Sequence, residues 1–120
     1  MRAPTATPAA TNYYDGLNLK LLDAIPAKAR RVLELGCANG LLGRRFKELH
    51  PGVQWCGVDV SADAVAAASQ HLDRAVQLDL DNADLSVLEG GFDVIVIGDL
   101  LEHLRDPGRV LSALYDLGTE

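Results

Sequence analysis

The sequence predicts an α/β fold in which helices cover both faces of a doubly wound, parallel sheet. Short apolar runs alternate four times with segments whose apolar residues have helical spacing. The runs are nearly continuous in apolar residues, as in strands that are buried on both faces. The 120 residues, of which 48% are hydrophobic, suffice for one small domain. Right-handed crossovers with one switch point then predict the strand order 3-2-1-4.

Each element follows from local signals. Apolar residues at helical spacing predict a first helix over residues 17–25, which Pro26 ends. Ser61 predicts an N-cap for a later helix, and Pro107 is typical of the first turn of the last one. The predicted strands are residues 32–35, 53–60, 75–80 and 92–97. The other predicted helices are residues 42–49, 62–72, 85–88 and 100–104.

The composition excludes several classes of function. The chain carries 11 Lys and Arg against 17 Asp and Glu, so its net charge of −6 argues against a broad contact with nucleic acid. No apolar run approaches the roughly 18 residues of a membrane-spanning helix. Residues 1–12 lack the apolar segment of a signal peptide and predict a flexible leader before a domain over residues 13–120. Cys37 and Cys56 fit a reduced protein, so we expect a cytoplasmic location.

A glycine-containing turn follows the first predicted strand. Glycines there allow a sharp turn and the close approach of a ligand to the backbone. A dinucleotide-binding fingerprint would place glycines at 36, 38 and 41, where this chain has Gly36, Ala38 and Leu41. The mismatch disfavours a nicotinamide-dependent oxidoreductase, and no Gly-Lys-Ser/Thr of a phosphate loop follows. A turn that merely joins a strand to a helix is the simpler interpretation of this segment alone.

A carboxylate lies at or near the end of every predicted strand. These residues are Glu34, Asp59, Asp79 and Asp99. Ligands of open α/β sheets bind outside the carboxyl ends of the strands. Four acids there would repel a pyrophosphate but suit a ligand with hydroxyls, an amino group and positive charge. Asp59 follows the glycine turn at the spacing of an acid that accepts from ribose hydroxyls.

Four segments together resemble the successive motifs of class I S-adenosylmethionine-dependent methyltransferases, in the ubiquinone-biosynthesis-like branch. The segments are VLELGCANG, GVDVS, QLDLD and FDVIVIGDLLEHLRDP. The resemblance covers about residues 13–116 and implies a Rossmann-like fold. It also implies S-adenosylmethionine or S-adenosylhomocysteine as cofactor, and methyl transfer to an unidentified acceptor that is a small molecule or related to glycans.

The resemblance also implies a role for each matching residue. Gly36, Cys37, Ala38 and Gly40 would form the loop under the methionine part of the cofactor, with Glu34 supporting it. Asp59 would bind the ribose hydroxyls, and Val60 would pack on the adenine. The remaining implied contacts are Asp79 and the backbone of Leu80 at the adenine amino group, Asp99 and Leu100 at the methionine side, and Tyr13 or Tyr14 closing over the cofactor. The loop usually has glycine at position 38, and alanine is tolerable there if its φ is negative.

Methyl transfer needs alignment of nucleophile, methyl and sulfur more than it needs a base. His103 is the one candidate base near the end of the fourth strand, and packing or hydrogen bonding is the simpler role for it. Asp99, Glu102 and His103 share a spacing that suits a metal site. No later histidine completes such a site, so we expect no metal.

The chain ends after the fourth predicted strand, whereas similar enzymes continue with three more. We therefore expect the cofactor-binding part of a methyltransferase, with little turnover of its own, and a non-catalytic cofactor-binding module or scaffold is the alternative. Val94, Ile95, Val96 and Ile97 would form a sheet edge without the charges or prolines that protect natural edges. We expect this edge to pair with another copy or another chain.

Overall fold

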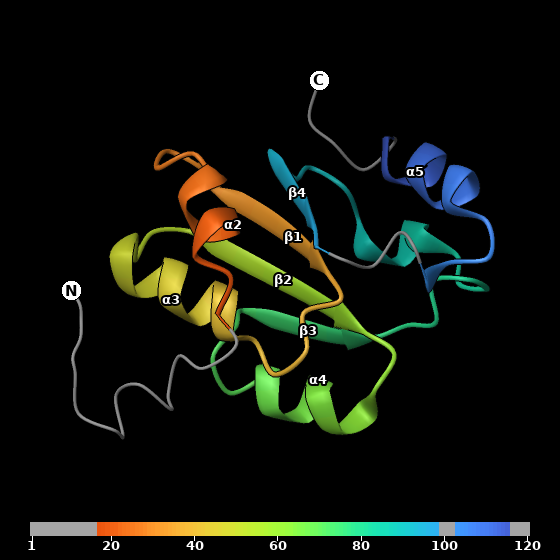
Figure 1. The fold of residues 1–120 in the computed structure, drawn as a ribbon, viewed down its shortest axis with the longest axis horizontal. Coiled ribbons are helices and arrows are strands. Elements are labelled where there is room, and N and C mark those ends of the chain that lie inside the picture. Colours follow the sequence, from red (N-terminus) through yellow and green to blue (C-terminus); the bar gives the residue numbers. More distant parts are fainter. Residues whose placement is uncertain (1–16, 99–102, 116–120) are drawn as a thin grey trace.

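The computed structural model describes residues 17–98 and 103–115 and shows a four-stranded parallel sheet in the order β3-β2-β1-β4 (Figure 1). This is the predicted order. The strands are β1 (Arg31–Leu35), β2 (Gln54–Asp59), β3 (Arg74–Gln77) and β4 (Val94–Ile97). Since all four strands are parallel, their carboxyl ends meet at one edge of the sheet.

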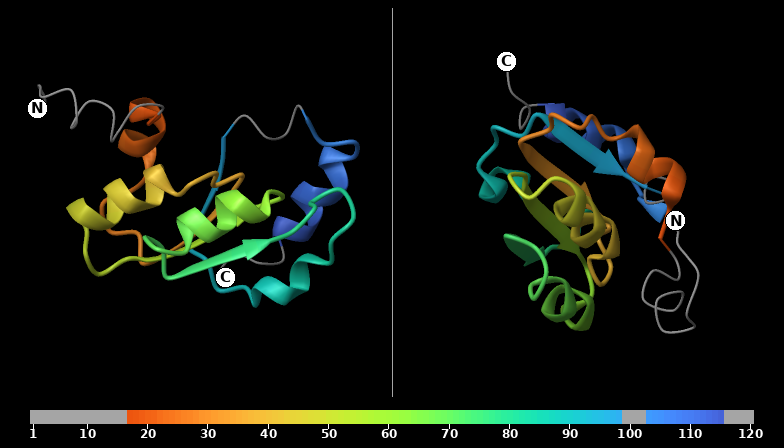
Figure 2. Two further views of the ribbon diagram at one scale, coloured as in Figure 1. Left: turned by 90° about the horizontal axis from the view of Figure 1, so that it is seen from below. Right: turned by 90° about the vertical axis from the view of Figure 1, so that its left-hand side faces the viewer.

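Helices form a layer on each face of the sheet (Figures 1 and 2). On one face lie α2 (Leu19–Ala24), α3 (Leu41–Leu49) and α4 (Ala62–Ala68). On the other lie the 3₁₀ helix η1 (Leu85–Leu88) and α5 (Pro107–Tyr115). Val32 and Leu33, adjacent in β1, are fully buried in opposite cores, which confirms the doubly wound architecture.

Capping explains several helix boundaries. The Ser61 hydroxyl accepts a hydrogen bond from the backbone N–H of Ala64 at 3.2 Å, so the predicted N-cap of α4 is confirmed. Pro107 is the first residue of α5, also as predicted. The α2 helix begins after Asn18, whose side-chain oxygen accepts from the N–H of Leu21 at 3.0 Å.

Several predicted boundaries were wrong or fall partly outside the described residues, and three of them bear on the site. The α4 helix ends at Ala68 rather than at residue 72, and the chain then turns so that Leu72 packs in the core. The third strand covers Arg74–Gln77 rather than residues 75–80, because its partner β2 ends at Asp59, opposite Gln77. Most of the helix predicted over residues 100–104 lies outside the described residues. No helix within residues 17–98 and 103–115 is long and apolar enough to cross a membrane.

Candidate functional site

The turn between β1 and α3 contains three residues with positive φ: Gly36 at 77°, Ala38 at 49° and Gly40 at 89°. The backbone N–H groups of Gly36 and Cys37 both donate to the carbonyl oxygen of Val58 in β2, at 2.7 and 2.9 Å. The N–H of Gly40 donates to the carbonyl of Cys37 at 2.9 Å and closes the turn. The loop therefore leaves the sheet sharply, and α3 begins directly after it.

The backbone at Ala38 corrects one expectation. The alanine was expected to be harmless at negative φ, but its φ is 49°, in the left-handed region that glycine adopts without a steric penalty. For an L-residue this conformation costs roughly 1–2 kcal/mol. The backbone N–H of Ala38 donates to Oδ2 of Asp59 at 2.9 Å, a bond to a charged acceptor that offsets part of this cost.

Asp59, the last residue of β2, joins two loops of the site. Its Oδ2 accepts from the N–H of Ala38, and its Oδ1 accepts from the N–H of Ser61 at 3.0 Å. An ionised carboxylate has about four acceptor positions, so two remain for hydroxyl donors of a ligand. The neighbouring Val60 is 64% exposed, an unusual position for a large apolar side chain that nothing in the described residues covers.

Glu34 lies in β1, two residues before Gly36, and is the one buried charged residue among those described, at 7% exposure. The indole N–H of the fully buried Trp55 donates to its Oε1 at 3.1 Å. Burial raises the pKa of the Glu34 carboxyl to about 8, and the negative charge of Asp59 acts in the same direction. Glu34 is therefore mostly protonated at neutral pH, and its hydrogen bond joins β1 to Trp55 in β2.

Cys37 is also buried beside the sheet. Burial, with smaller contributions from the charges of Glu34 and Asp59, raises the pKa of its thiol to about 12. A thiol in this state is neither a good nucleophile nor a metal ligand. The β2 residue next to it must be small, because a Cβ on Gly57 would lie 2.7 Å from the sulfur of Cys37.

Asp79 and Leu80 follow β3 and form the third part of the site. Oδ1 of Asp79 accepts from the backbone N–H of Asp81 at 3.0 Å, and Oδ2 accepts from the side-chain amide of Asn82 at 2.7 Å. Asp79 is exposed, whereas the side chain of Leu80 is buried in the core under η1 and α5. Leu80 therefore presents only its backbone to the site.

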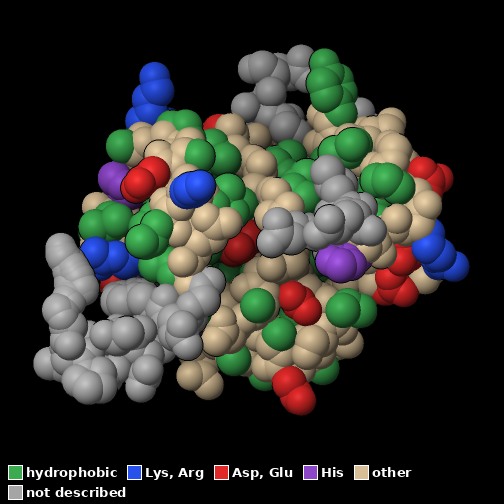
Figure 3. Space-filling model, in the orientation of Figure 1, with side chains coloured by type: hydrophobic (Ala, Val, Ile, Leu, Met, Phe, Trp, Pro, Cys, Tyr) green, Lys and Arg blue, Asp and Glu red, His purple; other side chains and the backbone are tan. Residues whose placement is uncertain are grey.

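The structure brings nine of the thirteen predicted site residues to the carboxyl ends of β1, β2 and β3. They are Glu34, Gly36, Cys37, Ala38, Gly40, Asp59, Val60, Asp79 and Leu80. Figure 3 shows acidic side chains exposed in the middle of this view and others nearer its margins. Of the other four, Tyr14, Asp99 and Leu100 lie outside the described residues, and His103 is exposed just before α5.

Two arginines beyond β4 contact the same edge of the sheet, and the sequence reasoning missed them. Arg105 donates from its backbone to Asp81 and from its guanidinium to Asn82, and Arg109 donates to the carbonyl of Leu80. No motif marks these contacts, because they join exposed polar groups far apart in sequence. Within the described parts of the chain, no cluster of three or more His, Cys, Asp or Glu residues is arranged to hold a metal ion.

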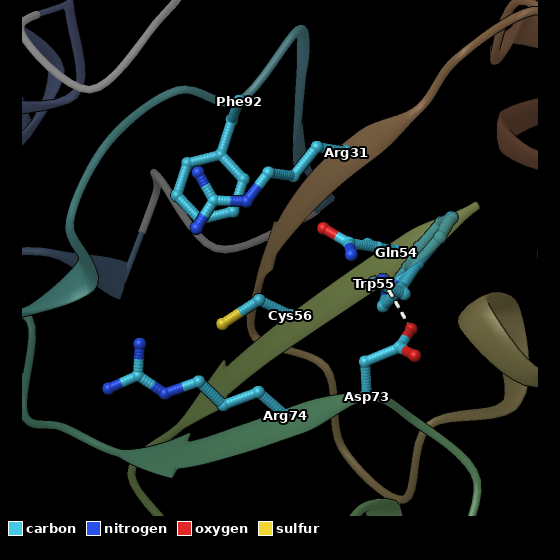
Figure 4. Close-up of a pocket in the computed structure, with 7 residues that line it drawn as sticks. All are labelled: Arg31, Gln54, Trp55, Cys56, Asp73, Arg74 and Phe92. Carbon is cyan, nitrogen blue, oxygen red and sulfur yellow. Dashed lines mark hydrogen bonds between the residues drawn. The ribbon is translucent and has the colours of Figure 1, made fainter.

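A hollow of about 210 Å³ lies at the opposite, amino end of the sheet (Figure 4). The arginines that line it make structural contacts. In Figure 4 the guanidinium of Arg31 lies over the Phe92 ring, 4.4 Å from its centroid. Arg31 also donates to the carbonyl of Gly90, and Nη1 of Arg74 lies 4.0 Å from Oε1 of Glu89. These contacts attach the loop after η1 to the start of the sheet, so both arginines have structural partners.

Residues 33–119 match the methyltransferase-domain family. Among curated relatives, the ubiquinone biosynthesis O-methyltransferase of Albidiferax ferrireducens is 32% identical over 98 residues, which cover 77% of this chain and 38% of the relative. The enzyme of the same name from Rhodopseudomonas palustris is 37% identical over 86 residues, covering 68% of this chain and 33% of the relative. The chain thus spans a third to two fifths of the length of these relatives.

Solved structures share the fold at low sequence identity. The plantazolicin methyltransferase BpumL in complex with SAH superposes with a TM-score of 0.73 at 17% identity, covering 95% of this chain and 51% of that one. Coclaurine N-methyltransferase, bound to N-methylheliamine and SAH, has a TM-score of 0.70 at 18% identity, covering 99% of this chain and 36% of that one.

Proposed function

Because this chain belongs to the methyltransferase-domain family, we propose that its site binds S-adenosylmethionine or S-adenosylhomocysteine and serves methyl transfer to an acceptor. The observation that carries the proposal is the position of Asp59. Its carboxylate fastens the positive-φ loop after β1 and keeps acceptor capacity at the end of β2. A ligand with vicinal hydroxyls and a cationic sulfur fits a site with these acceptors.

Each described part of the site has a distinct task in this proposal. The loop at residues 36–40 offers close backbone approach to the methionine part, and Asp59 accepts from the ribose hydroxyls. Asp79 accepts from the adenine amino group, and the exposed Val60 packs on the base. The neutral Glu34 keeps the loop in place without adding a charge beneath it.

S-adenosylmethionine supplies an activated methyl group on a sulfonium, so the protein's main contribution to the rate is alignment. The acceptor we propose is a small molecule or is related to glycans, as the resemblance implies, and not a nucleic acid, given the net charge of −6. Tyr14, Asp99 and Leu100 complete the proposed cofactor contacts. His103 is the proposed base for an acceptor hydroxyl.

Calorimetry with S-adenosylhomocysteine tests this proposal. Replacing Asp59 by Ala removes a charged acceptor of two hydroxyls and one anchor of the loop, so we expect the affinity to fall at least about tenfold. The matched control is Asp63→Ala, because Asp63 is an exposed acid in the first turn of α4 and its removal changes the net charge equally. Equal affinity in wild type and Asp59→Ala contradicts the assignment.

A turnover assay separates catalysis from binding. Assayed with varied acceptors, this chain should bind the cofactor with little turnover, well below about 1 per second. Turnover at that rate or faster would contradict this expectation, and cofactor binding without transfer to any acceptor would favour a non-catalytic module. We also propose a cytoplasmic location, which rests on two buried, unpaired cysteines.

The free edge of β4 is the proposed contact for a second copy or a partner chain. β4 pairs with β1 on one side, and no strand within the described residues pairs with its other side. All four of its residues are apolar and β-favouring, so the unpaired backbone groups invite strand addition. Light scattering at about 100 μM should show association. A monomer at that concentration would refute this part of the proposal.

A further inference from the structure

Arg105, from beyond β4, contacts Asn82, which in turn contacts the carboxylate of Asp79 beyond β3. Asn82 donates its side-chain amide to Oδ2 of Asp79 at 2.7 Å, and the carbonyl oxygen of the same amide accepts from Nη2 of Arg105 at 3.1 Å. We infer that the two hydrogen bonds that link Arg105, Asn82 and Asp79 make the site selective for a 6-amino purine over a 6-oxo purine. This inference rests on the proposed binding of an adenosyl cofactor.

The direction of the hydrogen bonds follows from the chemistry of the partners. A guanidinium can only donate, so Arg105 requires the oxygen of the Asn82 amide on its side. The amide nitrogen of Asn82 then points to Asp79, where it donates to Oδ2. Asp79 is thereby held as an acceptor, with Oδ1 bound to the N–H of Asp81 at 3.0 Å.

Two further contacts hold the loop after β3 and do not depend on the Arg105 side chain. The backbone N–H of Arg105 donates to Oδ1 of Asp81 at 2.8 Å. Nη2 of Arg109 donates to the carbonyl oxygen of Leu80 at 2.7 Å. Because these bonds survive truncation of Arg105, an alanine there removes the orientation of Asn82 while the loop stays attached to α5.

The chemical consequence concerns the ligand atom that faces Asp79. The remaining lone pairs of a fixed carboxylate accept from an exocyclic amino group and repel a carbonyl oxygen at the same place. A site built to hydrogen-bond one donor discriminates strongly against an analogue that lacks it. If Asn82 turns freely, the carboxylate can move away from the carbonyl and the discrimination weakens. Arg105 and Asn82 are therefore positioning residues, and Asp79 makes the contact.

The experiment compares S-adenosylhomocysteine with its 6-oxo analogue, S-inosylhomocysteine, by calorimetry at one pH and salt concentration. We expect wild type to prefer the amino form by at least about tenfold. Arg105→Ala and Asn82→Ala should each reduce this ratio at least about threefold. The matched control is Arg45→Ala, since Arg45 is a half-exposed arginine of α3 that pairs with Glu48, and the affinity ratio of this variant should equal that of wild type.

The ratio of the two affinities distinguishes positioning from a merely structural role. Loss of a merely structural contact would lower the affinity for both ligands equally and leave the ratio unchanged. An unchanged ratio in Arg105→Ala therefore overturns the inference. Wild-type binding without preference for the amino form also overturns it, while the proposed function stands. Failure of wild type to bind S-adenosylhomocysteine overturns the proposed function and the inference with it.

Discussion

The two sides of the candidate site are held by different physical means. On the side of the loop after β1, the contacts are made by buried groups: Glu34 is bonded to the fully buried Trp55, and Cys37 packs against Gly57. The loop after β3 is held at the surface by exposed polar groups, of which the Arg105 side chain is 73% exposed. The difference suggests that the first side depends on the stability of the fold and the second on hydrogen-bond geometry.

The largest expected effect comes from a substitution on the buried side of the site, at the loop after β1. Trp55 is fully buried and is a donor to Glu34, so Trp55→Ala both leaves a cavity and removes that bond. We expect the free energy of unfolding to fall by about 3–5 kcal/mol, measured by urea denaturation. The matched control is Tyr115→Ala, at an aromatic residue that is 89% exposed, with an expected change within about 0.5 kcal/mol. Similar losses in the two variants would contradict the importance of burial here.

The next effect concerns pH and the same buried carboxyl. The folded-state pKa of Glu34 is about 8, above its ordinary value of 4.5, so the folded state retains a proton that the unfolded state releases. This contribution to stability is fully present below pH 4.5 and is lost as the pH rises toward 8. The slope is at most about 1.4 kcal/mol per pH unit.

Replacement by a neutral isostere isolates this slope. Glu34→Gln keeps an acceptor for Trp55 without a titrating group. The free energy of unfolding of this variant, relative to that of wild type, should therefore increase as the pH rises. Urea denaturation between pH 5 and 8 measures the difference, with Asp63→Asn as an exposed control. A difference between wild type and Glu34→Gln that is constant over this range would show that Glu34 is charged in the fold.

The sequence predicts the strand order and local caps better than it predicts contacts between distant parts of the chain, for a physical reason. Hydrophobic runs are local signals of strands, and right-handed crossovers restrict their order, so the order β3-β2-β1-β4 and the N-cap Ser61 were predictable. The end of β3 was not, because it depends on where β2 ends in space. The partners of Arg105 lie more than 20 positions away, at 81 and 82, and no periodicity records such contacts.

The conformation of Ala38 is another feature that the sequence did not predict. Residue type alone indicates negative φ for alanine, but the positions of Gly36, Gly40 and the acceptor Asp59 place it at 49°. Ala38→Gly should therefore relieve left-handed strain and raise the free energy of unfolding by about 0.5–1 kcal/mol. Ala66→Gly, inside α4, is the control and should lower it by a similar amount. A loss of stability in Ala38→Gly would contradict the positive φ.

The smallest expected effect comes from a substitution on the exposed side of the site, at the loop after β3. Arg105→Ala removes one exposed guanidinium that bonds Asn82 and lies 3.7 Å from Asp81, and such pairs contribute little in water. Its free energy of unfolding should therefore change by no more than about 0.5 kcal/mol. Asp81→Ala should cost more, about 1 kcal/mol, because it also removes the acceptor of the Arg105 backbone N–H. Urea denaturation of both variants beside wild type measures the two values. A loss in Arg105→Ala as large as that in Trp55→Ala would show that this surface contact supports the fold, and that the two sides of the site do not differ as argued.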